Sequence, residues 1–277
     1  MTGQAMTQPV TDDARYEALR IERDGAVARL VFNRPDKLNS FNAAQRRELI
    51  DAVDRLNADA ALRVIILTGE GRAFSAGADL AEGFAGEAAQ RGAHTEHMLK
   101  TEDKRSLMGI VEAPKLWIAE VRGAAAGIGS AYMLACDFAV MAESSYLYQA
   151  FAAIGLIPDG GATWQLLKAV GRRRALEIIL GGERIPAQRC LELGLCNRVV
   201  ADGEEEAAAR SWAAQLARKA PLAVQYSKQA LALAENTGLG DMIAREAELQ
   251  RLCIASDDAE EGVRAFLEKR EASFSGR

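Results

Sequence analysis

The stretch Leu116-Trp-Ile-Ala-Glu-Val-Arg-Gly-Ala-Ala-Ala-Gly-Ile-Gly129 changes from an apolar run to a turn built of glycine and alanine. The run Leu116–Val121 predicts a buried strand, and the small residues lead into a helix that ends near Cys136. A further strand is predicted at Asp137–Ala142. Because strand, turn and helix recur at least twice with similar lengths, we predict an α/β fold of stacked β-β-α units around one core.

The residues before this stretch predict a hairpin followed by alternating helices and strands. Tyr16–Arg23 and Ala26–Asn33 flank Asp24-Gly25, a dipeptide that strongly favours a two-residue hairpin turn. Apolar spacing then predicts a helix at Ala43–Ala58 and a strand buried on both faces at Val64–Thr68. A mobile loop at Gly83–Gly92 and a second helix at Thr95–Glu112 are predicted to follow.

The residues after the stretch divide into a continued core and a helical region. Ser145–Phe151 is predicted to be extended, and a helix and the strand Cys196–Val200 follow Pro186. Beyond Asp202-Gly203 the pattern is helical only, with helices predicted at Glu204–Arg218, Pro221–Asn236, Leu239–Ala255 and Ala259–Arg270. We therefore divide the chain into a disordered tail (1–14), a core (15–202) and a helical region that makes subunit contacts (203–277).

Composition and charge argue against several classes of function. Apolar residues make up 49% of the 277-residue chain and charged residues 26%, which is ordinary for a globular enzyme. The net charge of −5 argues against nucleic acid or an anionic membrane as the main partner. The four cysteines form no CxxC pair, and the start of the chain lacks the basic and apolar segments of a secretory signal. We therefore expect a soluble, cytoplasmic protein.

Two motifs are not expected to be functional sites. Gly127-Ile-Gly129 follows a strand, as in dinucleotide-binding folds, but Tyr132 stands where that fingerprint needs a third glycine. His94 and His97 lie three residues apart in polar surroundings without a third ligand nearby, so we expect no metal site. Because they are the only histidines in the sequence, no Ser-His-Asp triad can be assigned.

Two loops of small residues are candidates for binding an anionic oxygen. Ser75-Ala-Gly-Ala78 and Ala126-Gly-Ile-Gly129 each follow a predicted strand, and their small side chains let backbone amides approach a ligand. Two such loops can direct two N–H groups to one oxygen, which is how an oxyanion is stabilised. For either loop alone, close packing of a tight turn is the alternative.

The stretch Phe151-Ala-Ala-Ile-Gly-Leu-Ile-Pro-Asp-Gly-Gly-Ala-Thr-Trp164 places one acid, Asp159, in a turn before a helix. From this stretch alone, the favoured interpretation is a helix N-cap, whose carboxylate accepts hydrogen bonds from the first amides of the helix. The alternative is a catalytic acid, whose pKa the apolar neighbours Phe151, Leu156 and Ile157 raise by desolvation. The two amide-rich loops, and the scarcity of other acids to serve them, favour this alternative.

Five motifs in order, spread from Tyr16 to Arg277, resemble the crotonase (enoyl-CoA hydratase/isomerase) superfamily. They are Asn33-Arg-Pro-Asp-Lys-Leu-Asn39, Gly71-Arg-Ala-Phe-Ser-Ala-Gly-Ala-Asp-Leu80, Val121-Arg-Gly-Ala-Ala-Ala-Gly-Ile-Gly129, Ile154-Gly-Leu-Ile-Pro-Asp-Gly-Gly161 and Glu261-Gly-Val-Arg-Ala-Phe-Leu-Glu-Lys-Arg270. The resemblance implies a crotonase-like spiral of β-β-α units with a C-terminal α-helical trimerisation region. It also implies a homo-trimer or hexamer and an acyl-CoA thioester substrate, with no separate cofactor because coenzyme A is part of the substrate.

The resemblance also assigns roles to individual residues. The two oxyanion amides fall on Ala78 and Ile128. Contacts to coenzyme A fall on the loops at the mouth of the site and on the last helix, at Arg34, Lys37, Leu38, Ala76, Asp79, Leu80, Phe266 and Lys269. The last two residues serve either the same subunit or a neighbouring one.

The sequence departs from the family at the two glutamates that its hydratases use. Ala131 and Phe151 occupy those places, and neither can activate or protonate a water molecule, so hydration is not expected. An acid at Asp159 is instead what the family's isomerases use to move a proton between carbons. Within the family, the likeness is greatest to the ring-1,2-epoxyphenylacetyl-CoA isomerases of phenylacetate catabolism.

We therefore expect an acyl-CoA isomerase that shifts a double bond, or rearranges a ring epoxide, through a thioester enolate with Asp159 as acid and base. Two alternatives stay open. In one, Asp159 is a nucleophile of a dehalogenase or hydrolase, although the family's dehalogenase pairs that residue with a histidine and with a tryptophan at the position of Phe151. In the other, the chain binds coenzyme A without catalysis, because both hydratase glutamates are absent.

Overall fold

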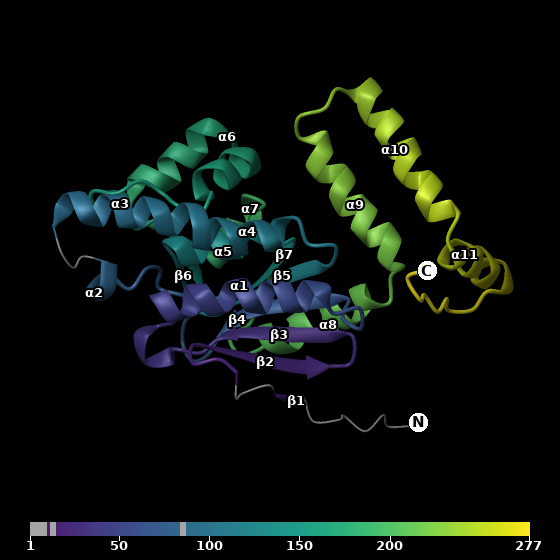
Figure 1. The fold of residues 1–277 in the computed structure, drawn as a ribbon, viewed down its shortest axis with the longest axis horizontal. Helices are drawn as coiled ribbons and strands as arrows, with labels where there is room; N and C mark the ends of the chain where they lie inside the picture. Colours follow the sequence, from purple (N-terminus) through teal and green to yellow (C-terminus); the bar gives the residue numbers. More distant parts are fainter. Residues whose placement is uncertain (1–9, 12–14, 84–86) are drawn as a thin grey trace.

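The computed structural model describes residues 10–11, 15–83 and 87–277 (Figure 1). Of the predicted tail at 1–14, it describes only the short strand β1 (Val10–Thr11), which pairs antiparallel with β2 (Leu19–Asp24). The rest of that prediction lies outside the described residues.

The larger sheet has the strand order β1-β2-β3-β4-β5-β7-β10. The strands β2 and β3 form the predicted antiparallel hairpin, with Gly25 at φ +57° in its turn, and the other pairs from β3 to β10 are parallel. The bounds of these strands are Val27–Phe32 (β3), Val64–Gly69 (β4), Leu116–Val121 (β5), Phe138–Ala142 (β7) and Arg198–Val200 (β10).

A smaller sheet lies beside it, in the order β6 (Ala124–Ala126), β8 (Tyr146–Tyr148) and β9 (Arg184–Pro186). The chain passes from β5 in the larger sheet to β6 in the smaller sheet and then into helix α5 (Ile128–Ala135). It repeats this path through β7 and β8 to helix α6 (Ala162–Gly181). This repetition is the predicted succession of β-β-α units.

Helices cover both faces of the larger sheet. Side chains along a strand point alternately to the two faces, and those of the central strands are buried on both. One face packs on α1 (Ala43–Ala58), α4 (Lys104–Val111) and α5, and it holds most of the apolar core. The other face packs on α8 (Glu205–Ala217), whose Ala209 and Ala213 contact the buried side chains of β4 and β5. The predicted helical region at 203–277 thus begins with a helix that lies on the sheet, while its role in subunit contacts stays a prediction.

The segment before α4 differs from the prediction. A helix forms at α2 (Leu80–Gly83), and α3 (Ala88–Met98) continues through the π-helical segment η2 (Leu99–Asp103) into α4. The predicted mobile loop is therefore helical at Ala88–Gly92, and its residues 84–86 lie outside the described residues. Strong helix formers such as Ala88, Ala89 and Gln90 outweigh the cost of Gly92, which is about 1 kcal/mol relative to alanine.

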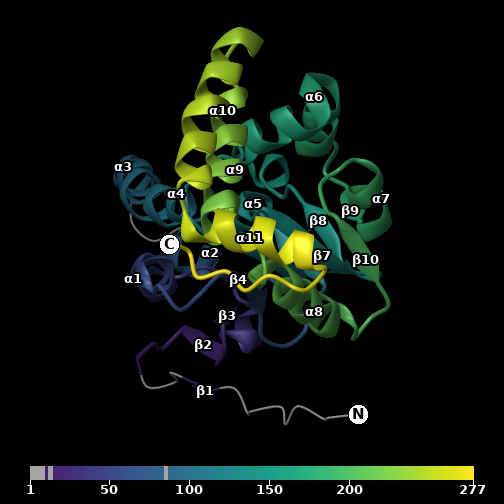
Figure 2. The same ribbon diagram turned by 90° about the vertical axis from the view of Figure 1, so that its right-hand side faces the viewer.

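The last helices extend away from the core. The helices α9 (Pro221–Ala234) and α10 (Leu239–Ile254) form a hairpin that projects from the sheet (Figures 1 and 2). The helix α11 (Asp257–Glu268) lies across the open end of this hairpin, where α10 ends. The remaining helix, α7 (Ala187–Glu192), precedes β10. Within the described part of the chain, no helix combines the length and apolar character that crossing a membrane requires.

Candidate active site

The two loops of small residues are joined by backbone hydrogen bonds. The N–H of Ser75 donates to the carbonyl of Ala124 at 2.9 Å, and the N–H of Ala126 donates to the carbonyl of Ser75 at 2.9 Å. This short parallel bridge extends β6 toward the first loop. The two loops, more than forty residues apart in sequence, therefore lie side by side.

A glycine in each loop makes this contact possible. Gly77 and Gly127 have φ values of +97° and +51°, which favour glycine over residues with a side chain. A Cβ atom on Gly77 would lie 3.0 Å from the carbonyl oxygen of Ala126, and one on Gly127 would lie 3.5 Å from the Cα of Gly77. The structure thus brings together the residues that directly precede Ala78 and Ile128.

The amides of Ala78 and Ile128 are both available to a ligand. Gly77 accepts a hydrogen bond from the N–H of Phe41 at 2.8 Å, and Asp79 donates to the carbonyl of Phe41 at 3.0 Å. In an extended chain the peptide between them faces the other way, so the Ala78 N–H points away from Phe41. Ile128 is the first residue of α5, where an amide has no acceptor within the helix. This geometry suits the predicted oxyanion pair.

The Asp159 turn packs on the same end of α5. Gly160, at φ +58°, lies so close to this helix that a Cβ atom there would be 2.4 Å from the Cδ1 of Ile128 and 2.8 Å from the Cβ of Ala131. The ring of Phe151 lies 3.8 Å from the Cβ position of Gly127. The Asp159 turn, Ala131 and Phe151 therefore all lie close to the residues that carry the second candidate oxyanion amide.

The interpretation of Asp159 as a helix cap is wrong. The N-cap of α6 is Gly161, and no side chain caps this helix. Asp159 contributes only its backbone carbonyl, which accepts from the N–H of Ala162 at 3.0 Å. Its Oδ1 is buried and has no hydrogen-bond partner among the described residues. The pair of glycines, both at positive φ, turns the chain so that the side chain of Asp159 cannot serve the first turn of the helix.

The environment of Asp159 raises the pKa of its carboxyl to about 7. The largest cause is burial, the nearby carboxylate of Asp103 adds to it, and the guanidinium of Arg46 opposes it. The predicted cause was partly wrong, because Leu156 and Ile157 are 46% and 84% exposed. The turn instead packs against buried side chains of α4 and α5.

Arg46 and Asp103 were missed by sequence reasoning, although a signal was present. Arg46 precedes Leu49 and Val53 of α1 at the three-to-four-residue spacing of its apolar stripe, and Asp103 precedes Leu107 of α4 in the same way. Burying a charged residue of an apolar stripe costs much free energy unless an opposite charge lies beside it. Such a residue on each of two predicted helices indicates that the two charges meet.

The predicted coenzyme A residues divide into two groups. Those of the first loops lie together: the N–H of Ala76 donates to the carbonyl of Leu38 at 2.9 Å, and Arg34 pairs with Asp79 at 3.1 Å. Lys37 and Leu80 are exposed beside them. Phe266 lies in α11 and Lys269 is its C-cap, and this helix lies at the opposite end of the molecule from α2 (Figure 1). The single chain therefore does not bring these two residues beside the first loops, and their contact with coenzyme A stays a prediction.

Comparisons with known proteins agree with this architecture. A family model described as Enoyl-CoA hydratase/isomerase matches residues 22–277. The chain is 40% identical over 262 residues to a probable enoyl-CoA hydratase of Rhodobacter capsulatus, covering 95% of this chain and 99% of that protein. It is 35% identical over 254 residues to the 1,2-epoxyphenylacetyl-CoA isomerase of Escherichia coli, covering 91% and 95%. The crystal structure of enoyl-CoA hydratase from Bacillus anthracis matches with a TM-score of 0.89 at 32% identity, over 94% of this chain and 100% of that chain.

The architecture is thus that of the crotonase fold, an α/β spiral with helices at its C-terminal end. The chain belongs to the enoyl-CoA hydratase/isomerase family of the crotonase superfamily. It is an enzyme of a family that acts on acyl-CoA thioesters.

Proposed function

We propose that this protein is an acyl-CoA isomerase in which Asp159 moves a proton between carbons of the acyl group. The observation that carries the proposal is the carboxyl of Asp159, which has one buried, unpaired oxygen among the described residues and belongs to a turn that packs on the first turn of α5, with Ala131 and Phe151 at the positions of the hydratase glutamates. The names of the relatives support both a hydratase and an isomerase. The side chains at these three positions favour the isomerase.

In the proposed reaction, the thioester oxygen of the substrate accepts hydrogen bonds from the N–H groups of Ala78 and Ile128. Loss of a proton from carbon gives an enolate, and each preorganised donor stabilises such an oxyanion by about 3 kcal/mol. The ionised carboxylate of Asp159 takes the proton and returns it to another carbon of the same conjugated system. A carboxyl with a pKa of about 7 is well suited to both steps near neutral pH.

The replacement of both hydratase glutamates limits what else this site can do. Ala131 is fully buried and Phe151 is 6% exposed, so apolar surface stands where a hydratase activates water. An apolar wall also protects the enolate from stray protonation by solvent. The substrate class is therefore an unsaturated acyl-CoA, or a ring epoxide of one, that rearranges without gaining water.

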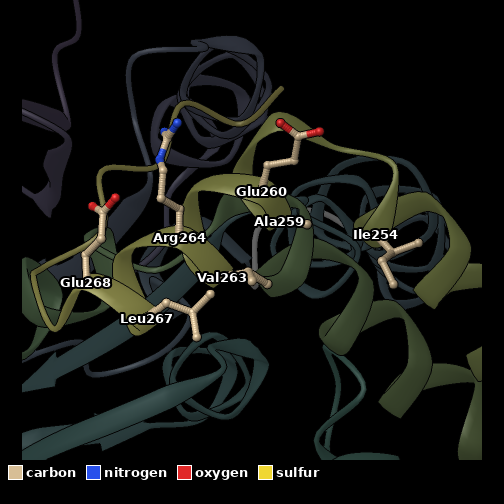
Figure 3. Close-up of a pocket in the computed structure, with 7 residues that line it drawn as sticks. All are labelled: Ile254, Ala259, Glu260, Val263, Arg264, Leu267 and Glu268. Carbon is tan, nitrogen blue, oxygen red and sulfur yellow. The ribbon is translucent and has the colours of Figure 1, made fainter.

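We further propose that the enzyme works as a trimer or a pair of trimers in the cytoplasm. The apolar side chains of α11 are uncovered in the single chain, with Val263, Phe266 and Leu267 each more than 60% exposed. Ile254, Val263 and Leu267 line a shallow pocket of about 480 Å³ where α10 meets α11 (Figure 3). A second copy that covers this surface brings Phe266 and Lys269 to a neighbouring coenzyme A site. The free thiols of all four cysteines support a reducing compartment.

The test is a screen of 2-enoyl-, 3-enoyl- and epoxyphenylacetyl-CoA thioesters, with the products separated by mass and retention time. An isomerase gives products of unchanged mass. A product heavier by one water molecule from a 2-enoyl-CoA, at a rate comparable with isomerisation, would overturn the proposal. Binding of coenzyme A without conversion of any thioester would indicate that the protein is a non-catalytic member of the family.

A further inference from the structure

A buried ion pair lies one helical turn from the residue of α4 on which the Asp159 turn packs, and the proposed reaction does not use it directly. A Cβ atom on Gly160, the residue after Asp159, would lie 3.2 Å from the Cδ1 of Leu107, and Leu107 follows Asp103 by four residues. The Nε of Arg46 on α1 lies 3.4 Å from the Oδ1 of Asp103 in η2. The side chains of Arg46 and Asp103 are 9% and 1% exposed. Burying two charges costs several kcal/mol per ion unless close contacts offset it. A distance of 3.4 Å is long for such a pair, so this contact offsets the cost only in part.

The position of Asp103 depends on the π-helical segment. Asp103 is the last residue of η2, where the wider helical turn meets α4. One turn later, the hydroxyl of Ser106 forms a hydrogen bond of 2.6 Å with the hydroxyl of Tyr132. Tyr132 lies on α5, four residues after Ile128. The pair is therefore attached to the helix whose first amide faces the proposed thioester oxygen, and π-helical turns are frequent at functional sites.

The polar atoms of this cluster are unusually short of partners. In the described part of the chain, neither carboxylate oxygen of Asp103, nor the Nε of Arg46, nor the Oδ1 of Asp159 has a hydrogen-bond partner. The ionisable groups that act on Asp159 are Asp103 and Arg46, and those that act on Asp103 are Arg46 and Glu102. Tyr132, which also lies close, stays neutral because burial raises the pKa of its hydroxyl well above the usual range.

One positive charge thus acts on two carboxyls, that of the buried Asp103 and that of the partly buried Asp159. If both carboxyls ionised, one of them would have no compensating charge in a medium of low dielectric constant. The balanced state has one carboxylate, one protonated carboxyl and the guanidinium. Consistent with this, burial raises the pKa of Asp103 to about 6, with Arg46 opposing the rise, and Asp159 titrates at about 7. Two carboxyls that interact strongly titrate as a pair, with midpoints that belong to the pair.

We propose that Asp103 and Arg46 are positioning residues for Asp159, and that ionisation of Asp159 is coupled to that of Asp103 through the single guanidinium. Asp103 as a carboxylate makes Asp159 hold its proton more tightly, and Arg46 limits that effect. The catalytic meaning of this coupling rests on the proposed isomerase, since a base that holds its proton tightly also takes it from carbon more readily. The coupling itself is a property of the folded chain without substrate.

The experiment follows the carboxyl carbons of the full-length protein by ¹³C NMR between pH 4 and pH 9, without substrate. In Asp103→Asn, the titration midpoint of Asp159 should fall by about one pH unit, because a neighbouring negative charge is lost. In Arg46→Gln it should rise by a similar amount, because a positive charge is lost. A purely structural role would not move the two variants in opposite directions.

A matched control exists on the same two helices. Asp54 of α1 and Arg105 of α4 form an ion pair of 2.7 Å whose side chains are 52% and 61% exposed. Asp54→Asn removes the same charge as Asp103→Asn but at the surface, so the Asp159 midpoint should not move. The pH profile of kcat/KM provides a second readout, in which the acidic limb should move with the midpoint of Asp159.

The reciprocal measurement covers the case in which either variant of the pair fails to fold. In Asp159→Asn the two-step titration of the cluster should become a single step of Asp103, since only one titrating carboxyl remains. Unchanged midpoints in the folded variants, or equal shifts with Asp54→Asn, would overturn the proposal. If the variants show the opposed shifts but the wild type isomerises no thioester, the proposed coupling stands and the proposed isomerase function is wrong.

Discussion

Two buried arginine–carboxylate clusters lie on either side of the larger sheet, and they differ in how completely their polar atoms are paired. Arg29 binds both oxygens of Glu120 at 3.0–3.3 Å and also Glu22 at 2.7 Å, and the hydroxyl of Thr68 donates to Glu120 at 3.1 Å. In the cluster of Arg46, Asp103 and Asp159, the structure gives, for the part of the chain that it describes, a single close contact between charges, the ion pair of 3.4 Å.

The burial of the two arginines does not account for this difference. The side chains of Arg29 and Arg46 are 8% and 9% exposed. A fully hydrogen-bonded network holds its charges in one arrangement, whereas an under-paired one leaves a carboxyl able to gain and lose a proton. We therefore expect the cluster of Arg29 to stabilise the fold and the cluster of Arg46 to control the protonation of Asp159. Each prediction below tests one of these two expectations.

The largest effect is expected for Asp159→Asn on turnover. An amide cannot accept a proton from carbon, so isomerisation of the active thioester should fall by about two to four powers of ten. The affinity for the substrate should change little, since the amides of Ala78 and Ile128 remain. The measurement is kcat and KM with the thioester that the screen identifies. Full turnover in a folded variant would remove Asp159 from the reaction.

Arg29→Met should act on stability and not on turnover. Removing one partner of a buried, hydrogen-bonded pair leaves Glu120 uncompensated, which costs about 3–5 kcal/mol in the free energy of unfolding. The folded fraction should keep the kcat of the wild type, because Arg29 lies on the face of the sheet away from the site. Urea unfolding and active-site-normalised rates measure the two quantities. Arg105→Met, at an exposed pair, is the control and should cost at most about 1 kcal/mol.

Loss of turnover with intact stability in Arg29→Met would reverse the comparison. It would show that the fully paired network, and not the under-paired one, communicates with the reacting groups.

A smaller effect is expected for Asp159→Asn on stability, and its sign depends on pH. The pKa of Asp159 is about 7 in the folded chain and about 3.9 in an unfolded one, so the folded state binds the proton more tightly. This carboxyl therefore costs the wild type stability as pH rises from about 4 to about 7, with no further loss above. Asp159→Asn should be more stable than the wild type by on the order of 2 kcal/mol at pH 8 and nearly equal to it at pH 4.

Urea unfolding of both proteins at the two pH values measures this difference. A variant that is less stable at pH 8 would indicate that the Asp159 carboxylate makes a stabilising contact, as a helix cap does.

Much of this architecture was predictable because it depends on local sequence. Asp24-Gly25 gave the hairpin, and the apolar spacing in Ala43–Ala58 gave α1 with the observed bounds. The glycines of the two loops could be interpreted because a close approach of two backbones requires them at Gly77 and Gly127. The helices of the C-terminal region were also predicted within a few residues.

What the sequence could not show depends on long-range packing. The turn at Asp159 had two local interpretations, and only the φ values of Gly160 and Gly161 with the contacts of α5 decide between them. The π-helical segment that carries Asp103 has no sequence signature of its own. The surroundings of Asp159 were misjudged because its neighbours in sequence are exposed while its neighbours in space are buried.

The smallest effect is expected for Glu120→Gln on the pH profile, and it is the sharpest test of the comparison. Burial raises the pKa of Glu120, with Arg29 opposing the rise, so this residue resembles Asp103 in its own electrostatics. It differs in position, since it faces α8 and the ion pairs of β2 and β3, not α5. Glutamine keeps the shape and one acceptor oxygen, so the variant should fold with a lower free energy of unfolding. The acidic limb of kcat/KM should stay near pH 7, where ionisation of Asp159 sets it in the wild type. A limb that moves in Glu120→Gln as far as in Asp103→Asn would mean that the net charge of the core, and not a neighbour of Asp159, sets its protonation.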